Sequence, residues 1–246
     1  MSVDQRKKIS ISIVSHAQGS LIRNLLSDLQ ALGKSLYDLE ILLTINIPED
    51  EAFVAEFPSL SLRIIRNIHP KGFGANHNAA FKYSIGDYFV ILNPDVRFSC
   101  LDFSILENAL SIDSVGVCAP AVFSTKGCKE DSARHFPTIS RLIKRKFDRS
   151  SLIEYEYNKS PLVVEWVAGI FMMFKRHFYE QVGGFDERYF MYLEDADICR
   201  RLMCMGYHTI LVPAVSIVHD AQRHSRREFK YFMMHIRSAI RFILNF

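Results

Sequence analysis

Hydrophobic residues in the first part of the chain form short, dense runs separated by polar or amphipathic stretches. Runs rich in Ile, Leu and Val are typical of buried β-strands, and they cover residues 9–14, 39–45, 62–65 and 88–92. Between the first two runs, leucines recur at helical spacing from Leu21 to Leu32, and Gly33 follows as a helix stop. A further helix is predicted over 76–84. Strands that alternate with helices predict an α/β fold with an open, mostly parallel central sheet.

The second half of the chain continues this pattern after an interruption. It predicts a helix over 101–110 and a strand over 115–122, whereas 124–160 shows little periodicity and is expected to be a mobile or acceptor-facing segment and not part of the core. Order returns over 163–174. A helix over 194–205, strands over 209–212 and 216–218, and a final helix from residue 229 complete the prediction.

Length and composition favour a single domain. A chain of 246 residues with 49% hydrophobic content can bury one sizeable core. We expect this domain to cover 1–222. Residues 223–246 form a basic amphipathic helix that either belongs to the same domain or contacts a membrane surface.

Charge and cysteine content narrow the function classes. The net charge is +3, but six of the Lys and Arg residues lie within 223–246 with one Glu, so the rest of the chain is slightly acidic. Nucleic-acid binding is therefore not expected. The five cysteines form no CxxC pair, which predicts reduced thiols, and the charged first residues lack the apolar region of a secretory signal. The longest apolar run, 167–174, is too short to span a bilayer. These features predict a cytoplasmic protein.

Polar residues follow several predicted strands directly. Ligands of open α/β sheets bind at the carboxyl ends of the strands, so Ser15, His16, Asn46 and the Asn93-Pro94-Asp95 turn should open onto one crevice. Pro94 favours extended geometry at Asn93, which ends the strand and turns Asp95 outward, where its oxygens can meet a hard cation. The alternative is that the turn is only a structural signal. His16 likewise has two interpretations, a contact with a nucleotide or a structural histidine.

Two glycines precede the second predicted helix in the segment 71–78. Gly72 and Gly74 would let the backbone approach a ligand closely, and the helix start, with Asn78, would favour phosphate. The spacing matches neither a Walker loop nor the dinucleotide fingerprint.

Carboxylates gather at the start of the helix predicted from residue 194. Glu194, Asp195 and Asp197 could carry out proton chemistry on a bound ring. They could also complement the helix dipole, with Asp197 paired to Arg201 one turn away. Upstream, Trp166 and Gly169 mark a break before an apolar strand, and the indole could stack on a sugar face or lie in the core.

Taken together, these motifs resemble the family 2 glycosyltransferases of GT-A fold, in particular the bacterial rhamnosyltransferase-like branch. The resemblance covers roughly 9–225. The motifs that carry it are Gly72-Phe73-Gly74-x-Asn76-x-Asn78, Asn93-Pro94-Asp95, Gly169, Gly183-Gly184-Phe185-Asp186-Glu187, Tyr192-x-Glu194-Asp195-x-Asp197 and His219.

The resemblance implies roles for particular residues. Asp95 would help to hold Mg²⁺ or Mn²⁺ against the donor diphosphate, with His219 close to the metal, and Asp195 would be the catalytic base. Asp197 would support the site or its helix. One position departs from the family pattern, because Asn46 stands where relatives usually carry an Asp that hydrogen-bonds the nucleobase.

The implied activity is inverting transfer of a sugar from a nucleotide diphosphate donor. The favoured donor is dTDP-rhamnose, with a UDP-sugar as the alternative, and the acceptor is a lipid-linked saccharide or polysaccharide of a surface glycan. The C-terminal helix would contact the cytoplasmic face of the inner membrane, or would cover the sheet instead. Two other functions stay open at this point, a sugar nucleotidyltransferase and a non-catalytic nucleotide-sugar binding module.

Overall fold

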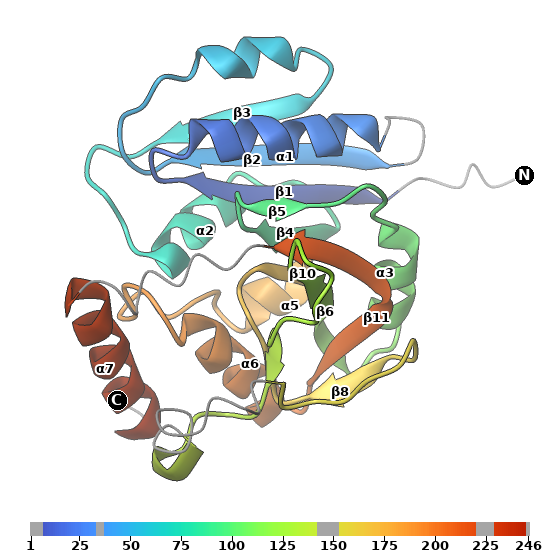
Figure 1. The fold of residues 1–246 in the computed structure, drawn as a ribbon, viewed down its shortest axis with the longest axis vertical. Helices are drawn as coiled ribbons and strands as arrows, with labels where there is room; N and C mark the ends of the chain where they lie inside the picture. The colour runs from blue at the N-terminus through green and yellow to red at the C-terminus, as the bar shows by residue number, and fades with distance from the viewer. Residues whose placement is uncertain (1–6, 33–36, 142–152, 220–228, 245–246) are drawn as a thin grey trace, which may run out of the picture.

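A mixed sheet organises the chain, as the computed structural model shows for residues 7–32, 37–141, 153–219 and 229–244 (Figure 1). Within these residues the sheet has nine strands, ordered β3-β2-β1-β4-β10-β6-β11-β5, with β8 also paired to β11. Its strands are β1 (Lys8–Ser15), β2 (Asp38–Ile45), β3 (Ser61–Arg66), β4 (Tyr88–Leu92), β5 (Val96–Arg97), β6 (Val115–Phe123), β8 (Leu162–Val164), β10 (Phe171–Lys175) and β11 (His208–His219).

The long strands share one direction, with a single exception. Strands β3, β2, β1 and β4 pair in parallel, and β6 pairs in parallel with β11. Strand β10 lies between the two groups and runs antiparallel to both β4 and β6. The carboxyl ends of β1, β2, β4 and β11 therefore lie at one edge, and the amino end of β10 lies at that same edge.

Helices cover both faces of this sheet (Figure 1). One face packs against α1 (Gly19–Ala31), α3 (Phe103–Leu110) and the 3₁₀ helix η1 (Ala52–Glu56). The other packs against α2 (Phe73–Phe81), α5 (Arg176–Gln181), α6 (Glu194–Cys204) and α7 (Phe229–Leu244). Because both faces are covered, even the polar positions of β1 are buried, and Ser10 and Ser12 hydrogen-bond Glu40 and His77.

The sequence predictions differ from the structure mainly at element boundaries. Helix α2 begins at Phe73, not at residue 76, so Gly74 lies in its first turn. The two strands expected over 209–218 are one strand, β11, with an irregularity between Val212 and Ser216. The stretch 163–174 divides into β8, β9 (Trp166–Val167) and β10, and α5 was not predicted.

The irregular segment expected over 124–160 contains one short strand in its described part, β7 (Ala133–Arg134). It pairs antiparallel with β9, so that Arg134 lies opposite Trp166. Residues 142–152 of the predicted segment lie outside the described part of the chain.

Helix α7 packs on the core with one face and exposes another. Ala239 and Phe242 are buried, and the Ser238 hydroxyl donates to the Met191 carbonyl at 2.8 Å. Exposed apolar side chains on the same helix are Phe232, Met233, Ile240 and Leu244. Arg226 and the side chains of Phe229 and Lys230, which also belong to the predicted amphipathic pattern, lie outside the described residues. Across the described residues, no helix is long and apolar enough to cross a membrane.

The buried His77 allows a direct test of the packing between α2 and β1. Burial lowers the pKa of His77 to about 3, whereas an unfolded histidine titrates near ~6.5. Between these values only the unfolded chain gains a proton, so stability falls with decreasing pH by about 1.4 kcal/mol per pH unit for this group. We expect the unfolding free energy of His77→Gln, measured in urea between neutral pH and pH ~4, to fall less steeply with decreasing pH than that of wild type. The difference should equal this slope.

The matched control is His69→Gln, because His69 is exposed and its substitution should preserve the wild-type slope. An unchanged slope in His77→Gln would contradict a buried, neutral His77.

Candidate functional site

The carboxyl edge of the sheet gathers most of the residues singled out from the sequence. Ser15 ends β1, Asn46 follows β2, Asn93 follows β4 and His219 ends β11. Gly169 lies just before β10 at the same edge, because Phe171 pairs with Leu92. The expected convergence of these positions is therefore present in the structure.

Asp95 and His219 form a buried pair at this edge. The Oδ2 atom of Asp95 lies 3.2 Å from Nε2 of His219, and their side chains are only 17% and 9% exposed. The pair forms because β5 and β11 run side by side, with His219 opposite Val96. The second carboxylate oxygen of Asp95 and the second ring nitrogen of His219 are buried without a hydrogen-bond partner.

The facing atoms of this pair, Oδ2 of Asp95 and Nε2 of His219, are close enough to bind one divalent cation together. A carboxylate oxygen and an imidazole nitrogen are accepted ligands of Mn²⁺, and Mg²⁺ is commonly held by one or two carboxylates together with substrate phosphates. Among the described residues no cluster of three or more His, Cys, Asp or Glu side chains is suited to hold a metal. A cation bound at Asp95 and His219 would therefore keep positions open for a ligand.

Asp195 is held by two backbone amides at the start of α6. Its Oδ2 accepts from the Gly169 N–H at 2.9 Å, and its Oδ1 accepts from the Ala196 N–H at 2.8 Å. Asp195 as a whole residue is neither fully buried nor fully exposed. Gly169 also packs tightly, because a Cβ at this position would lie 2.9 Å from Cζ of Phe73.

The two acidic positions are connected through neighbouring backbone. The Asn93 N–H donates to the carbonyl of Ile170 at 2.9 Å, and Ile170 follows the glycine that binds Asp195. Asp95 lies two residues after Asn93. Two hydrogen bonds thus join the turn that carries Asp95 to the helix start that carries Asp195, over a sequence separation of 100 residues.

Electrostatics at the start of α6 favour proton uptake. Burial raises the pKa of the Asp195 carboxyl above its usual range, although the amides of Gly169 and Ala196 and the charge of Arg134 oppose this shift. Burial and the neighbouring Asp195 raise the pKa of Glu194 well above its ordinary value, and one Glu194 oxygen has no hydrogen-bond partner. Two adjacent acids in a desolvated site hold a proton more readily than free carboxylates do.

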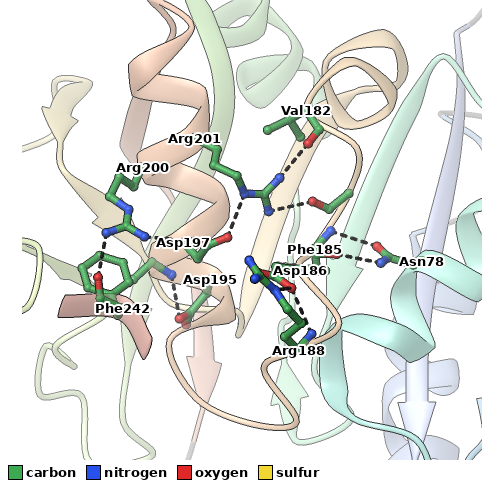
Figure 2. Close-up of polar contacts among 12 residues, drawn as sticks. Asn78, Val182, Phe185, Asp186, Arg188, Asp195, Asp197, Arg200, Arg201 and Phe242 are labelled. Atoms are coloured by element: carbon green, nitrogen blue, oxygen red, sulfur yellow. Dashed lines mark hydrogen bonds and ion pairs between the residues drawn. The ribbon is translucent and has the colours of Figure 1, made fainter. Parts of the chain in front are cut away.

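Asp197 serves α6 and its neighbours. Its carboxylate lies 2.7 Å from Nε of Arg201, the pair one turn apart that the alternative interpretation predicted, and 3.2 Å from Arg200. Arg201 in turn donates to the carbonyl of Val182, as Figure 2 shows, and also to the carbonyl of Gly184. The pair thereby ties α6 to the glycine turn before it.

Asn78, which was expected to contact a ligand, hydrogen-bonds protein groups in the structure. Figure 2 shows it facing Phe185, whose N–H and C=O both bond to the amide. Tyr179 donates to the same amide oxygen at 2.7 Å, and the amide nitrogen also reaches Glu187. The polar atoms of Asn78 are therefore committed to the 185–187 loop.

Gly72 and Gly74 do allow a close backbone approach, but the approaching group is protein. A Cβ at Gly72 would lie 2.5 Å from the Phe190 carbonyl oxygen, and a Cβ at Gly74 would lie 2.5 Å from Cβ of Phe185. The glycine motif near residue 72 is thus explained by contact with the 185–190 loop, about 110 residues later. Sequence reasoning missed this because neither motif carries a local sign of its partner.

Asn46 is likewise occupied. Its amide oxygen accepts from the Lys71 N–H at 2.8 Å and from Asn67 at 2.9 Å, and its nitrogen lies near His16 and the Lys71 carbonyl. With only 5% of its surface exposed, Asn46 fixes the Lys71 loop and is not placed to pair with a base. Asn67, which no motif indicated, extends this network to Asn76 at 2.6 Å.

Ser15, His16 and Trp166 complete the predicted set. Ser15 is buried and accepts from the Gln18 N–H, which shapes the turn after β1, whereas His16 is exposed at the same edge. Trp166 is only 3% exposed, and its indole N–H donates to the His135 carbonyl. The core interpretation of the indole is therefore the one that fits the structure, and stacking on a sugar does not.

Comparison with known proteins gives a consistent result. The model of glycosyl transferase family 2 matches residues 10–183, and a model described as the N-terminal domain of galactosyltransferase matches residues 149–234. The rhamnosyltransferase WbbL of Escherichia coli is 32% identical over 190 residues, which are 70% of each chain. An N-acetylglucosaminyl-diphospho-decaprenol L-rhamnosyltransferase of Mycobacterium tuberculosis is 28% identical over 58% of this chain and half of its own length.

Solved structures support the fold. GalNAc-T7 with UDP, GalNAc and Mn²⁺ has a TM-score of 0.68 at 16% identity and aligns with 88% of this chain and 43% of its own. The mannosyltransferase PcManGT of Pyrobaculum calidifontis, in complex with GDP-Man and Mn²⁺, has a TM-score of 0.65 at 20% identity over 97% of this chain and 65% of its own. The predicted GT-A architecture is confirmed by these neighbours.

Contact between Gly169 and Phe73 can be tested by a double-mutant cycle. A methyl group at residue 169 would press on the Phe73 ring, and overpacking of this kind costs about 1–3 kcal/mol. We expect Gly169→Ala to lose this much unfolding free energy in urea. Adding Phe73→Leu should recover at least ~0.5 kcal/mol relative to additivity, because the ring edge is removed. Strict additivity of the two substitutions would contradict the contact.

Proposed function

The chain belongs to glycosyl transferase family 2, and from this premise we propose that it transfers a sugar from a nucleoside diphosphate donor to an acceptor hydroxyl with inversion. The observation that carries the proposal is the pair of hydrogen bonds, Asn93 to Ile170 and Gly169 to Asp195, that brings the Asp95–His219 pair and the partly exposed Asp195 to one sheet edge. A group that can hold a cation and a group that can accept a proton are thereby placed together.

Asp195 is the proposed general base. A carboxylate within hydrogen-bond reach of the attacking hydroxyl takes its proton as the bond to the anomeric carbon forms, and typically contributes ~10²–10⁴-fold in rate. The two backbone amides fix the carboxylate orientation. Because the pKa of Asp195 is raised, the protonated and inactive form becomes populated at higher pH than for a free aspartate.

Asp95 and His219 are the proposed ligands of Mg²⁺ or Mn²⁺. When bound, the cation would neutralise the negative charge of the donor diphosphate. Asp95 and His219 would present the facing Oδ2 and Nε2 atoms to it, and the turn at Asn93-Pro94 would hold Asp95 at the strand end.

The finer substrate assignment follows the relatives. Two of them are named rhamnosyltransferases, which favours dTDP-rhamnose as donor over a UDP-sugar. The name of the mycobacterial relative includes a diphospho-decaprenol saccharide, which favours a lipid-linked acceptor in surface glycan synthesis. We assign both to this chain as part of the proposal.

Helix α7 is the proposed contact with the cytoplasmic membrane face. Phe232, Met233, Ile240 and Leu244 are exposed on a helix that also exposes Arg237. Together with the excess of basic residues over 223–246, this suits an anionic lipid surface. A protein held there would meet a lipid-linked acceptor directly.

Turnover by site variants tests the catalytic assignment. In a panel of nucleotide sugars, assayed for nucleoside diphosphate release with and without Mn²⁺, we expect Asp195→Asn to lose at least ~10²-fold in turnover while it still binds donor. Asp95→Ala should lose both turnover and the Mn²⁺-dependent part of donor binding. The control is Asp113→Asn, since Asp113 is fully exposed. Full turnover in Asp195→Asn would exclude it as the base.

Vesicle sedimentation tests the membrane contact. We expect Phe232→Glu combined with Ile240→Glu to reduce binding to vesicles of phosphatidylcholine and phosphatidylglycerol by about tenfold or more. Both substitutions remove an apolar side chain that would otherwise enter the lipid. Binding should also weaken as salt is raised. Ile112→Glu is the control, since Ile112 is comparably exposed and lies in the turn after α3. Equal binding by the double variant and the control would exclude α7 as the contact.

A further inference from the structure

Segment 134–140 connects the surroundings of Asp195 to a separate cavity. At its start, β7 pairs with β9, and the Ala168 N–H donates to the Ser132 carbonyl at 2.7 Å, next to the glycine that holds Asp195. The positive charge of Arg134, in this segment, lowers the pKa of the Asp195 carboxyl. Burial has the larger effect and raises it. Arg134 pairs with Trp166, which lies three residues before the glycine that holds Asp195, so this cation belongs to a segment that begins near the proposed base and leads away from it.

Arg134 is fixed in position yet accessible. Its guanidinium carbon lies 5.1 Å from the centre of the Trp166 ring, and its Nε bonds Asp131 at 3.0 Å. The Arg134 side chain retains 29% exposure. A guanidinium that is oriented by an indole and a carboxylate loses little freedom on binding an anionic oxygen, and its planar fork suits phosphate.

The far end of the segment borders an apolar cavity of about 670 Å³ between residues 137–140 and the end of α7. Pro137, Ile139, Phe242 and Ile243 line it, together with Arg200. The ring of Phe136 packs 6.0 Å from that of Phe242, which fixes the segment against α7. Ile139 is 62% exposed, so its side chain is accessible to a ligand in this cavity.

The charged and apolar positions are close in sequence. Three residues of extended chain from Arg134 to Pro137 cover at most roughly 10 Å, comparable with a diphosphate and the first isoprene unit of a lipid carrier. The cavity also adjoins α7, whose exposed apolar face carries Ile240. A ligand that is anionic near Asp195 and apolar toward α7 matches this order.

This inference rests on the proposed function. We propose that segment 134–140 binds the lipid-linked acceptor along its length, and we call it the acceptor track. Arg134 contacts the diphosphate of an isoprenoid-linked saccharide, and the cavity beside Ile139 holds the first isoprene units. The saccharide then lies at Asp195, and the rest of the lipid continues toward α7 and the membrane. Specificity for a lipid-linked acceptor would thus reside in the irregular segment and α7, outside the sheet.

Farnesyl diphosphate is a suitable probe, because it carries both groups without the saccharide. Its binding to the full chain is measured by titration calorimetry with EDTA and saturating dTDP present, so that the donor and cation sites do not contribute. We expect Ile139→Asp to weaken binding about tenfold or more through lost apolar contact, and Arg134→Gln by about fivefold or more through the lost charge-assisted hydrogen bond.

Matched controls separate the track from general effects. Ile112 is an exposed isoleucine in the turn after α3, and Ile112→Asp should bind like wild type. Wild-type binding by Ile139→Asp would overturn the apolar part, and wild-type binding by Arg134→Gln would overturn the anionic part. Weaker probe binding with dTDP than in a matched titration without dTDP would place the probe in the donor site and overturn both parts.

Inorganic diphosphate gives the remaining comparison. If it binds as tightly as farnesyl diphosphate, the site is an anion site without a lipid subsite, and the proposal fails. No sugar transfer is measured in these titrations, so their result is separate from that of the turnover assay. If the wild-type chain does not bind farnesyl diphosphate but turns over normally, this inference alone is overturned.

Discussion

The hydrogen bond between the Gly169 amide and the Asp195 carboxylate is the contact on which the site depends. It joins the start of α6 to the start of β10, and β10 enters the sheet at the edge where the parallel strands end. A parallel neighbour of β4 would begin at the opposite edge. The single antiparallel strand therefore brings a chain segment, and with it the second acidic residue, to the carboxyl edge where Asp95 and His219 already lie. Glycine is required at 169 because the Phe73 ring fills the space of a side chain.

Strain and charge are concentrated at the same helix start. Tyr192 and Leu193, which precede Glu194, both have positive φ, 71° and 65°, and such conformations cost roughly 1–3 kcal/mol each in residues other than glycine. Burial of Leu193 and the Arg201 bonds to Val182 and Gly184 hold the loop in this form. The strained turn places Glu194 and Asp195 in the first turn of α6, where the helix dipole favours negative charge while burial favours the proton. These opposing effects suit a group that must exchange protons.

Much of the fold could be predicted because its signals are local. The strands of the parallel half are short runs rich in Ile, Leu and Val, and Asn93-Pro94-Asp95 marks the end of β4 in the sequence itself. The functions of Asn46, Asn78, Gly72 and Gly74 could not be predicted in this way, because their partners are set by tertiary contacts. Asn78 and Gly74 meet Phe185, and Gly72 meets Phe190. The glycine motif at 72–78 and the loop 185–190 are thus two sides of one contact. When the glycine motif is considered alone, it is assigned to a ligand.

The two interpretations of the C-terminal helix are compatible for a related reason. An amphipathic pattern identifies an apolar face without stating what covers it, and α7 has apolar residues in two sectors. Ala239 and Phe242 pack on the core beside Arg200, whereas Phe232 and Ile240 face outward. The helix can therefore be fixed to the domain and still present an apolar surface. Since the cavity beside Ile139 opens between α7 and the irregular segment, any lipid surface that meets the outward sector lies next to the route toward Asp195. The sheet edge would then govern the donor, and the elements added outside the sheet would govern the acceptor.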